Sequence, residues 1–370
     1  ADLLPAANAE RLGPEDRGRH PKPDAEASGQ VSVNAVRQAF RQQAKACDAL
    51  GSPLMERLMT GLAERLQPGD PVADRILGWQ GDPSSNADSV PLRIAGGLHA
   101  LILTDKARAL AAAYASGDDP TDTALAMIRQ HPDFLLDWLT SPPQTNEVRR
   151  SAPLIAAAHW LTARFGLPLI LSELGASAGL NLLWDHYALR SGDQSFGPAN
   201  PALILTPDWT GPLPTPAPPT ILDRRGVDLN PLDPVTDHLR LLAYLWPDQP
   251  DRIARTRAAQ DLAAQIRPQV DHADAADWLE TRLSTPTPNA LHLVFHTVAW
   301  QYFPRATQTR ALAAMARVGA TTPLALLSME ADGLSPGAAL TLTLWPGGET
   351  IPLGRADFHG RWVDWTAPVI

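Results

Sequence analysis

The chain has 370 residues and is 44% hydrophobic, which supplies a large buried core and excludes a wholly disordered protein. Its 40 acidic and 31 basic residues give a net charge of −9, and lysine and arginine form no stripe that could follow a phosphate backbone, so no nucleic-acid partner is expected. The single cysteine, Cys47, excludes an internal disulfide and a cysteine metal cluster.

Residues 1–30 are polar and rich in proline, glycine and charge, which indicates a loose arm. They contain no secretory signal pattern, and no later segment offers about 18 uninterrupted apolar residues. We therefore expect a soluble cytoplasmic protein without a membrane partner. Over residues 31–150 apolar residues recur every three or four positions, and no convincing strand precedes residue 165. This pattern predicts an all-helical domain that caps the rest of the chain.

Residues 151–370 alternate between strand and helix patterns. A helix from Glu147 to Phe165 leads into the short apolar run 167–174, which is typical of a buried parallel strand. A proline-rich insertion covers residues 191–220. The remaining predicted strands are 221–229, 291–298, 323–330 and 339–347, with helices over 236–246, 250–266 and 307–319. Such alternation predicts an α/β fold with a Rossmann-like, doubly wound and mostly parallel sheet, for which we expect seven strands.

The segment Gly-Ala-Ser-Ala-Gly, residues 175–179, lies between the first strand and a helix predicted over residues 181–189. One interpretation is the sharp turn of a serine hydrolase, with Ser177 as nucleophile and Asp332 and His359 completing a triad. That fold needs several strands and an oxyanion-hole loop before the serine. Because the preceding sequence is predicted to be helical, the context disfavours a hydrolase.

The other interpretation is a loop whose small residues let a nucleotide-like cofactor reach the backbone amides and the positive end of the next helix. Glu173 ends the strand before the loop. Asp228 ends the second strand, where an acid binds ribose hydroxyls, although the insertion makes its separation from the loop far longer than the usual ~20 residues. Asp274 and Ala275 follow a short strand and turn predicted within 267–279, where they suit an adenine ring. Both aspartates also suit solvated turns.

These segments together resemble the class I S-adenosylmethionine-dependent methyltransferases over roughly residues 150–350. ELGASAGLNL is similar to their first motif, GVDLNPLD to the second, HADAADWL to the third and LHLVFHTVAWQYFP to the fourth. The serine within the first motif stands where many members have glycine. The resemblance implies S-adenosylmethionine as cofactor and methyl transfer to a small-molecule acceptor. The cofactor-binding residues that it implies are Glu173, Gly175, Ser177, Gly179, Asn181, Asp228, Asp274 and Ala275.

Nearly the full length of the chain also resembles an uncharacterised bacterial family, domain of unknown function 2332. The segments QTNEVRR, ELGASAGLNLL, DRRGVDLNPLD, YLWPDQPDR and FHTVAWQYFP carry this resemblance. It implies the same fold but no substrate. A methyltransferase-like module without catalysis therefore stays open as an alternative, beside the serine hydrolase.

His296 is the candidate base for the methyl acceptor. It stands at the tip of the strand predicted over 291–298, where open parallel sheets place their ligands, and its imidazole titrates near neutral pH. Tyr302 is the second candidate catalytic residue. Trp300 and Tyr302 can wall the acceptor pocket or shield the sulfonium by a cation–π contact. A histidine bonded within a turn and aromatic residues in the core are the alternatives.

The segment SPPQTNEVRRSA, residues 141–152, predicts a helix start that Thr145 or Asn146 caps. Arg149 and Arg150 stand near its positive end, where cations are disfavoured. We expect Asn146, Arg149 and Arg150 to bind a carboxylate, either of the cofactor's methionine moiety or of an acidic substrate; a salt bridge to local acids is the alternative. Trp300 completes the predicted substrate site. The ten histidines are scattered without a metal-binding motif, so no metal is expected.

Overall fold

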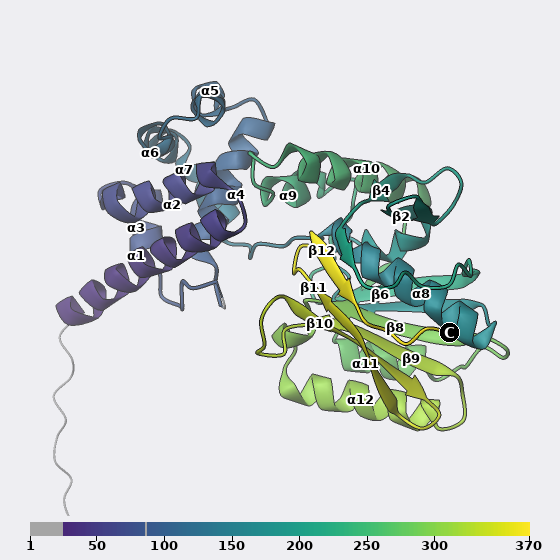
Figure 1. Ribbon diagram of the computed structural model, residues 1–370. Helices are drawn as coiled ribbons and strands as arrows, with labels where there is room; N and C mark the ends of the chain where they lie inside the picture. Colours follow the sequence, from purple (N-terminus) through teal and green to yellow (C-terminus); the bar gives the residue numbers. More distant parts are fainter. Residues whose placement is uncertain (1–24, 86) are drawn as a thin grey trace, which may run out of the picture.

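The computed structural model describes residues 25–370 apart from residue 86, with side chains from residue 33 onward. Most of the predicted arm, residues 1–30, lies outside the described residues, and residues 25–30 belong to the first helix. The structure has a helical part and an α/β part (Figure 1). The segment between them, residues 140–150, is called the strap below.

The helical part consists of amphipathic helices around one apolar core. Its helices are α1 (Ala25–Ala49), α2 (Pro53–Arg65), α3 (Pro71–Leu77), α4 (Val90–Leu103), α5 (Arg108–Ser116), α6 (Thr121–Gln130) and α7 (Pro132–Leu139). The helical pattern over residues 121–140 is divided at Pro132, which starts α7 because proline lacks the N–H that a helix interior needs. Phe40, Leu58 and Ile76 lie in the core, which Trp246 from the α/β part also enters. Among the described residues none before 165 forms a strand, as predicted.

The α/β part is built on a nine-stranded sheet with the order β5-β12-β11-β10-β9-β8-β1-β6-β7. The strands are β1 (Leu169–Leu174), β5 (Asp208–Thr210), β6 (Ile221–Asp228), β7 (Val270–His272), β8 (Leu291–Thr297), β9 (Leu324–Glu330), β10 (Ala338–Trp345), β11 (Glu349–Ala356) and β12 (Trp362–Trp365). Strands β7, β6, β1, β8 and β9 are parallel, whereas β10 and β11 run antiparallel to both of their neighbours. The mixed α/β class and the mostly parallel sheet are confirmed, but the sheet has nine strands rather than the seven expected.

Helices cover both faces of the sheet. On one face α8 (Ser151–Phe165) and α10 (Pro250–Ile266) contribute to the apolar cluster that contains Leu293 and Phe295, and on the other α11 (Ala275–Arg282) and α12 (Arg305–Gly319) contribute to the cluster that contains Val294. Successive strand residues point to opposite faces, so a strand buried on both sides is apolar throughout. Figure 1 shows the two layers on either side of the sheet. This arrangement leaves the carboxyl ends of the parallel strands at one edge, where the strap lies.

The prediction of a helix over residues 181–189 is wrong in type and in length, because only Asn181–His186 is helical and it forms a 3-10 helix. The short 3-10 helix η2 (Asn181–His186) contains the non-helical residue Leu183, and strand β2 (Tyr187–Ser191) follows it. Tyr187 and Leu189 are buried in the small sheet β3-β2-β4, which β3 (Gln194–Phe196) and β4 (Leu203–Leu205) complete. Because a long helix does not follow the glycine loop, a helix dipole cannot contribute there as expected.

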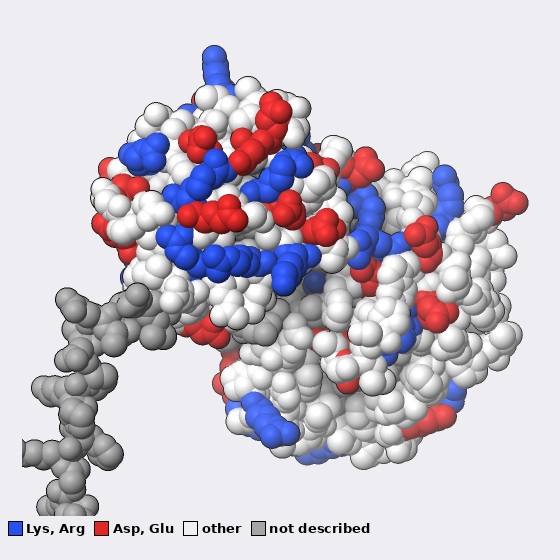
Figure 2. Space-filling model, turned by 60° about the vertical axis from the view of Figure 1, so that its left-hand side comes forward, with Lys and Arg blue, Asp and Glu red and all other residues white. Residues whose placement is uncertain are grey.

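Charged side chains on the face shown in Figure 2 are mixed in sign. Lysine and arginine are interleaved with aspartate and glutamate over the helical part, and the visible face of the α/β part is mostly uncharged. Among the described residues, none of the helices combines the length and the apolar character that crossing a lipid bilayer requires.

Candidate functional site

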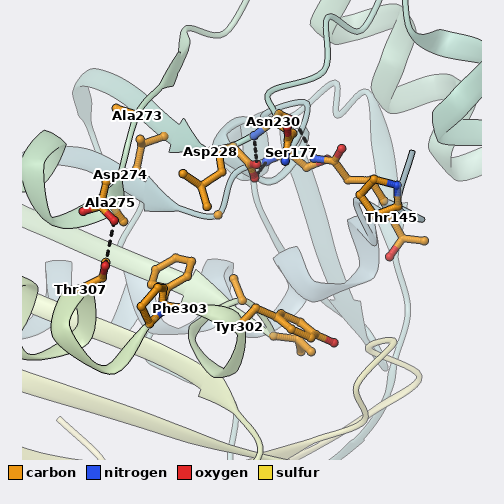
Figure 3. A pocket seen from close by; sticks show the side chains of 18 of the residues that line it. Thr145, Ser177, Asp228, Asn230, Ala273, Asp274, Ala275, Tyr302, Phe303 and Thr307 are labelled. Carbon is orange, nitrogen blue, oxygen red and sulfur yellow. Dashed lines mark hydrogen bonds between the residues drawn. The ribbon is translucent and has the colours of Figure 1, made fainter. Parts of the chain in front are cut away.

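A cavity of about 350 Å³ opens at the carboxyl ends of β1, β6, β7 and β8 (Figure 3). Its size suits a small-molecule site. The chain leaves β1 for β6 on one side, and β8 lies on the other side, so the cavity stands where the winding direction of the sheet reverses. The lining residues are Pro142, Pro143, Gln144, Thr145, Arg150, Gly175, Ser177, Val227, Asp228, Leu229, Asn230, Ala273, Asp274, Ala275, Val298, Ala299, Tyr302, Phe303, Pro304 and Thr307.

The glycine loop that follows β1 has three residues with positive φ. Gly175 at +75° and Ser177 at +53° line the cavity, whereas Gly179 at +70° does not. A Cβ atom on Gly175 would lie 2.5 Å from the Cβ of Ala299, so a side chain there would displace the loop from the turn after β8. Gly179 instead faces Val270, whose Cγ2 would lie 3.0 Å from an added Cβ. The close approach that Gly179 permits is therefore to β7.

The amides of the loop are bound by the protein itself. Gly175 and Ala176 donate to the carbonyl oxygen of Val227 at 2.9 and 3.0 Å, and the Ser177 amide donates to Asp228 Oδ2 at 2.8 Å. The expectation that these amides face a ligand is not met, since each has an acceptor already. The hydroxyl of Ser177 is different: it is buried and has no hydrogen-bond partner within the described residues. It is the polar side-chain group of the loop that is left for a ligand.

Asp228 ends β6 beside the loop and is half-buried. Its Oδ2 accepts the Ser177 amide and its Oδ1 accepts the Asn230 amide, each at 2.8 Å. An ionised carboxylate has about four lone-pair sites, so about two remain for further donors. The two backbone bonds fix the orientation of the carboxylate at the cavity wall.

Asp274 caps α11 at the far end of the cavity. Its Oδ1 accepts the amides of Ala276 and Asp277, and its Oδ2 accepts the Thr307 hydroxyl at 2.8 Å (Figure 3). Burial raises the pKa of this carboxyl, but the bonds from Thr307 and the two amides outweigh it and hold the pKa below its usual range. The segment predicted as a strand and turn thus contains a helix, and Ala275 is its first residue at the cavity wall.

Glu173 lies within the sheet and does not line the cavity. It is 1% exposed, and its Oε2 has no hydrogen-bond partner within the described residues. Burial raises its pKa well above the ordinary value, the charge of Asp228 adds to this, and Arg150 opposes it. The surroundings of this carboxyl therefore favour its neutral form over the charged one.

Replacing Glu173 by glutamine is expected to make stability less sensitive to pH. Because the folded-state pKa is raised, the folded wild type binds more protons than the unfolded chain above pH 4.5, and its free energy of unfolding falls as pH rises. The slope reaches at most about 1.4 kcal/mol per pH unit. In urea denaturation between pH 4 and 8, the free energy of unfolding of Glu173→Gln should therefore rise relative to that of wild type as pH increases. Glu64→Gln, at an exposed site on α2, should have the same pH dependence as wild type. If the difference in free energy of unfolding between wild type and Glu173→Gln stayed constant across this pH range, the carboxyl of Glu173 would not be neutral in the folded protein.

His296 lies beneath the cavity rather than in its wall. It is 2% exposed, its Nδ1 lies 2.8 Å from Glu330 Oε1, and its ring stacks on Trp300 with centroids 4.7 Å apart. The same carboxylate oxygen accepts the amides of Ala299 and Trp300. This network fixes the turn into η3 (Trp300–Tyr302), from which Tyr302, 66% exposed, lines the cavity. Neither His296 nor Trp300 lines the cavity, so their predicted roles have less geometric support than that of Tyr302.

Arg149 and Arg150 of the strap point to different places. Arg150 lines the cavity, although its side chain is largely buried, and donates from Nε to Phe358 O at 2.8 Å and from Nη1 to Thr297 O at 3.1 Å. Within the described residues its Nη2 has no hydrogen-bond partner and the guanidinium forms no ion pair. Burial lowers the pKa of this guanidinium. Arg150 therefore offers a free donor to an anionic ligand, whereas Arg149 lines a second cavity.

Asn146 and Asn181 hold the strap against the glycine loop. Asn146 Oδ1 accepts the amide of Leu180 at 2.8 Å, and Asn181 bonds the Glu147 carbonyl and the Ser151 hydroxyl. Both asparagines are buried and neither lines the cavity. Their predicted contacts to substrate and cofactor are replaced here by contacts within the protein.

The structure does not assemble the serine-hydrolase triad. Ser177 Oγ has no hydrogen-bond partner among the described residues, Asp332 pairs with Arg355 at 2.8 Å, and His359 lies against Trp246 at the second cavity. Hydrolysis by Ser177 would need the base within hydrogen-bond reach of the hydroxyl. Within the described part of the chain, no group of three or more histidine, cysteine, aspartate or glutamate side chains is arranged to hold a metal ion.

Residues 37–365 match a protein family described as "Uncharacterized protein conserved in bacteria", DUF2332. The chain belongs to this family. A search of curated proteins gave no significant match. The cavity of this DUF2332 member combines residues that lie far apart in the matched range, from Pro142 to Thr307.

Phe303 and Thr307 are among the cavity residues that the sequence did not predict. Phe303 lies across the cavity from Asp228 in Figure 3, and Thr307 binds Asp274. Phe303 belongs to the segment FHTVAWQYFP, in which only Trp300 and Tyr302 were predicted to line the acceptor pocket. Thr307 was predicted only as a helix residue, because its partner stands 33 positions earlier and no local pattern joins them.

Proposed function

We propose that this protein is an S-adenosylmethionine-dependent methyltransferase with a Rossmann-like fold that acts on a small-molecule acceptor. One observation carries the proposal: a single cavity unites Ser177, Asp228 and Asp274, which lie at the carboxyl ends of the neighbouring strands β1, β6 and β7 or just after them. The order β7-β6-β1-β8-β9 agrees with the order 3-2-1-4-5 of doubly wound nucleotide-binding sheets, if the five parallel strands are counted along the chain.

Each end of such a cofactor has a matching group in the cavity. The two free lone-pair sites of Asp228 suit the two ribose hydroxyls. Ala275 and Phe303 supply apolar surface for the adenine ring, and Asp274 supplies an acceptor for its amine. At the other end, the free Nη2 of Arg150 suits the methionine carboxylate, because a guanidinium binds carboxylates well.

The bound cofactor supplies a methyl group on a positively charged sulfur. The protein's part is to hold the acceptor in line with that group, and positioning contributes most of the rate in such a displacement. Tyr302 lies at the cavity, where its ring can face a cation. The strap residues 142–145 close the cavity on the side of the helical part and so limit the size of the acceptor.

The test is a titration of the full chain with S-adenosylmethionine and S-adenosylhomocysteine, followed by thermal unfolding and calorimetry. We expect saturable binding of both compounds, with about 2.7 kcal/mol of stabilisation at 100 times the dissociation constant. Adenosine should bind more weakly, because it lacks the carboxylate that Arg150 is proposed to hold. If neither compound binds the folded protein at millimolar concentration, the proposal fails, as it would for a module that has the fold without the cofactor.

A further inference from the structure

A second cavity of about 230 Å³ lies between the helical part and the α/β part, and it shares no lining residue with the first. The strap, the start of α10 and the loop after β11 form it together with Leu50. Its lining is rich in arginine: Leu50, Glu147, Arg149, Asp248, Gln249, Pro250, Asp251, Arg252, Arg255, His359 and Arg361.

Two of the four arginines are neutralised by the protein. Arg252 Nε bonds Glu147 Oε2 at 2.6 Å in a buried ion pair, and Arg361 bonds Asp357 at 2.8 Å. Arg149 and Arg255 form no ion pair with any described residue.

The acids of the lining form no ion pair with these two arginines among the described residues, although the charges of Glu147 and Asp251 partly stabilise the Arg255 cation. The carboxylate of Asp248 accepts the Ser52 hydroxyl at 2.6 Å and the Leu54 amide at 3.1 Å at the start of α2. Asp251 is exposed in the first turn of α10, where the helix amides favour a negative charge. Two guanidinium groups of the cavity thus have no ion-pair partner among the described residues.

The positive charges of the two unpaired arginines also repel each other. Burial lowers the pKa of Arg255, and the charge of Arg149 is the next largest cause. Arg255 Nε is buried without a hydrogen-bond partner among the described residues, which is costly for a charged group. Burial lowers the pKa of the nearby His359 to about 4, so that its neutral ring is available for hydrogen bonding. An anion between these side chains would satisfy all three.

We propose that this cavity binds the phosphate group of a small molecule, held by Arg149 and Arg255 with His359 beside them. A phosphate monoester carries a charge of about −1.5 to −2 at neutral pH, which matches two unpaired guanidiniums. A single carboxylate would match only one. Guanidinium groups also bind phosphate oxygens through paired, directional hydrogen bonds. The site does not depend on the methyltransferase proposal, because its residues lie outside the first cavity.

The test is calorimetric titration of the full chain with inorganic phosphate and pyrophosphate at constant ionic strength, with acetate as the carboxylate probe. We expect saturable binding of at least one phosphate probe and at least 10-fold weaker binding in Arg149→Gln and in Arg255→Gln, because each substitution removes one of the two charges proposed to hold the anion. Arg257→Gln is the matched control, since Arg257 is exposed on α10 two residues from Arg255 and outside the cavity. It should bind as wild type does.

Thermal unfolding without added anion gives an independent readout. Removing either unpaired cation relieves repulsion, so Arg149→Gln and Arg255→Gln should unfold at the wild-type temperature or above it. The proposal is overturned if neither phosphate probe binds saturably, if both variants bind as wild type does, or if acetate binds as tightly as phosphate.

Discussion

Asp228→Asn is expected to weaken binding of S-adenosylmethionine and S-adenosylhomocysteine by about 100-fold in calorimetric titration. Hydrogen bonds to a charged group contribute about 1.5–3 kcal/mol each, and the substitution removes the charge that would hold two ribose hydroxyls. A loss of about 3 kcal/mol corresponds to about two factors of ten in the dissociation constant. Because an asparagine side chain has nearly the same shape as aspartate, the glycine loop loses less support than it would with alanine.

The matched control is Asp261→Asn, at an exposed position on α10 outside the cavity lining, which should bind as wild type does. Far-UV circular dichroism and thermal unfolding without ligand show whether Asp228→Asn is folded. A folded Asp228→Asn protein that binds within about threefold of wild type would place the ribose elsewhere, because that ratio corresponds to less than one hydrogen bond to a charged group.

Glu147→Gln is expected to lower the free energy of unfolding by about 3–5 kcal/mol, measured by urea denaturation at pH 7. Glu147 is 3% exposed and pairs with the buried Arg252, and a buried ion pair that loses one partner leaves an uncompensated charge. The control is Glu349→Gln, which breaks the exposed pair with Arg164 and should cost less than about 1 kcal/mol. Equal losses in the two variants would show that the buried pair is not a special source of stability.

The same pair predicts a pH dependence. Burial raises the pKa of Glu147, but the charges of Arg252 and Arg150 and the hydrogen bond from the Arg149 amide outweigh it and hold the pKa below its ordinary value. A depressed folded-state pKa gives stability that is complete above the unfolded value and lost as pH falls through the folded one. The stability difference between wild type and Glu147→Gln should therefore be largest at neutral pH and shrink in acid.

The elements that sequence patterns predicted best are long or strongly apolar. Helix α10 has the predicted bounds, and β1, β6, β8 and β9 lie within the predicted runs or within one residue of them. Strand β5 was not predictable, because three residues in a proline-rich insertion become a strand only by pairing with β12. The end of segment 181–189 was mistaken for a helix because Tyr187 and Leu189 are buried by a small sheet whose other strands have only three residues each.

The candidate site was also predicted in part. The predicted residues that line the first cavity are Gly175, Ser177, Asp228, Asp274, Ala275, Tyr302 and Arg150. They come together because parallel strands end at one edge, a consequence of topology that alternating patterns reveal. Glu173, Gly179, His296 and the two asparagines lie outside the lining. The polar side chains among them suit ligand binding and internal bonding equally, and the choice depends on partners such as Glu330 that lie far away in sequence. Gly179 has no side chain and instead allows the close approach of Val270.

The strap belongs to both cavities. Residues 142–145 and Arg150 line the first, Glu147 and Arg149 line the second, and Asn146 bonds the glycine loop between them. A ligand in one cavity that shifts the strap therefore alters the free energy of ligand binding in the other cavity. This effect is reciprocal by thermodynamic necessity. A phosphate compound that tightens nucleoside binding must itself be held more tightly, by the same factor, when the nucleoside is bound.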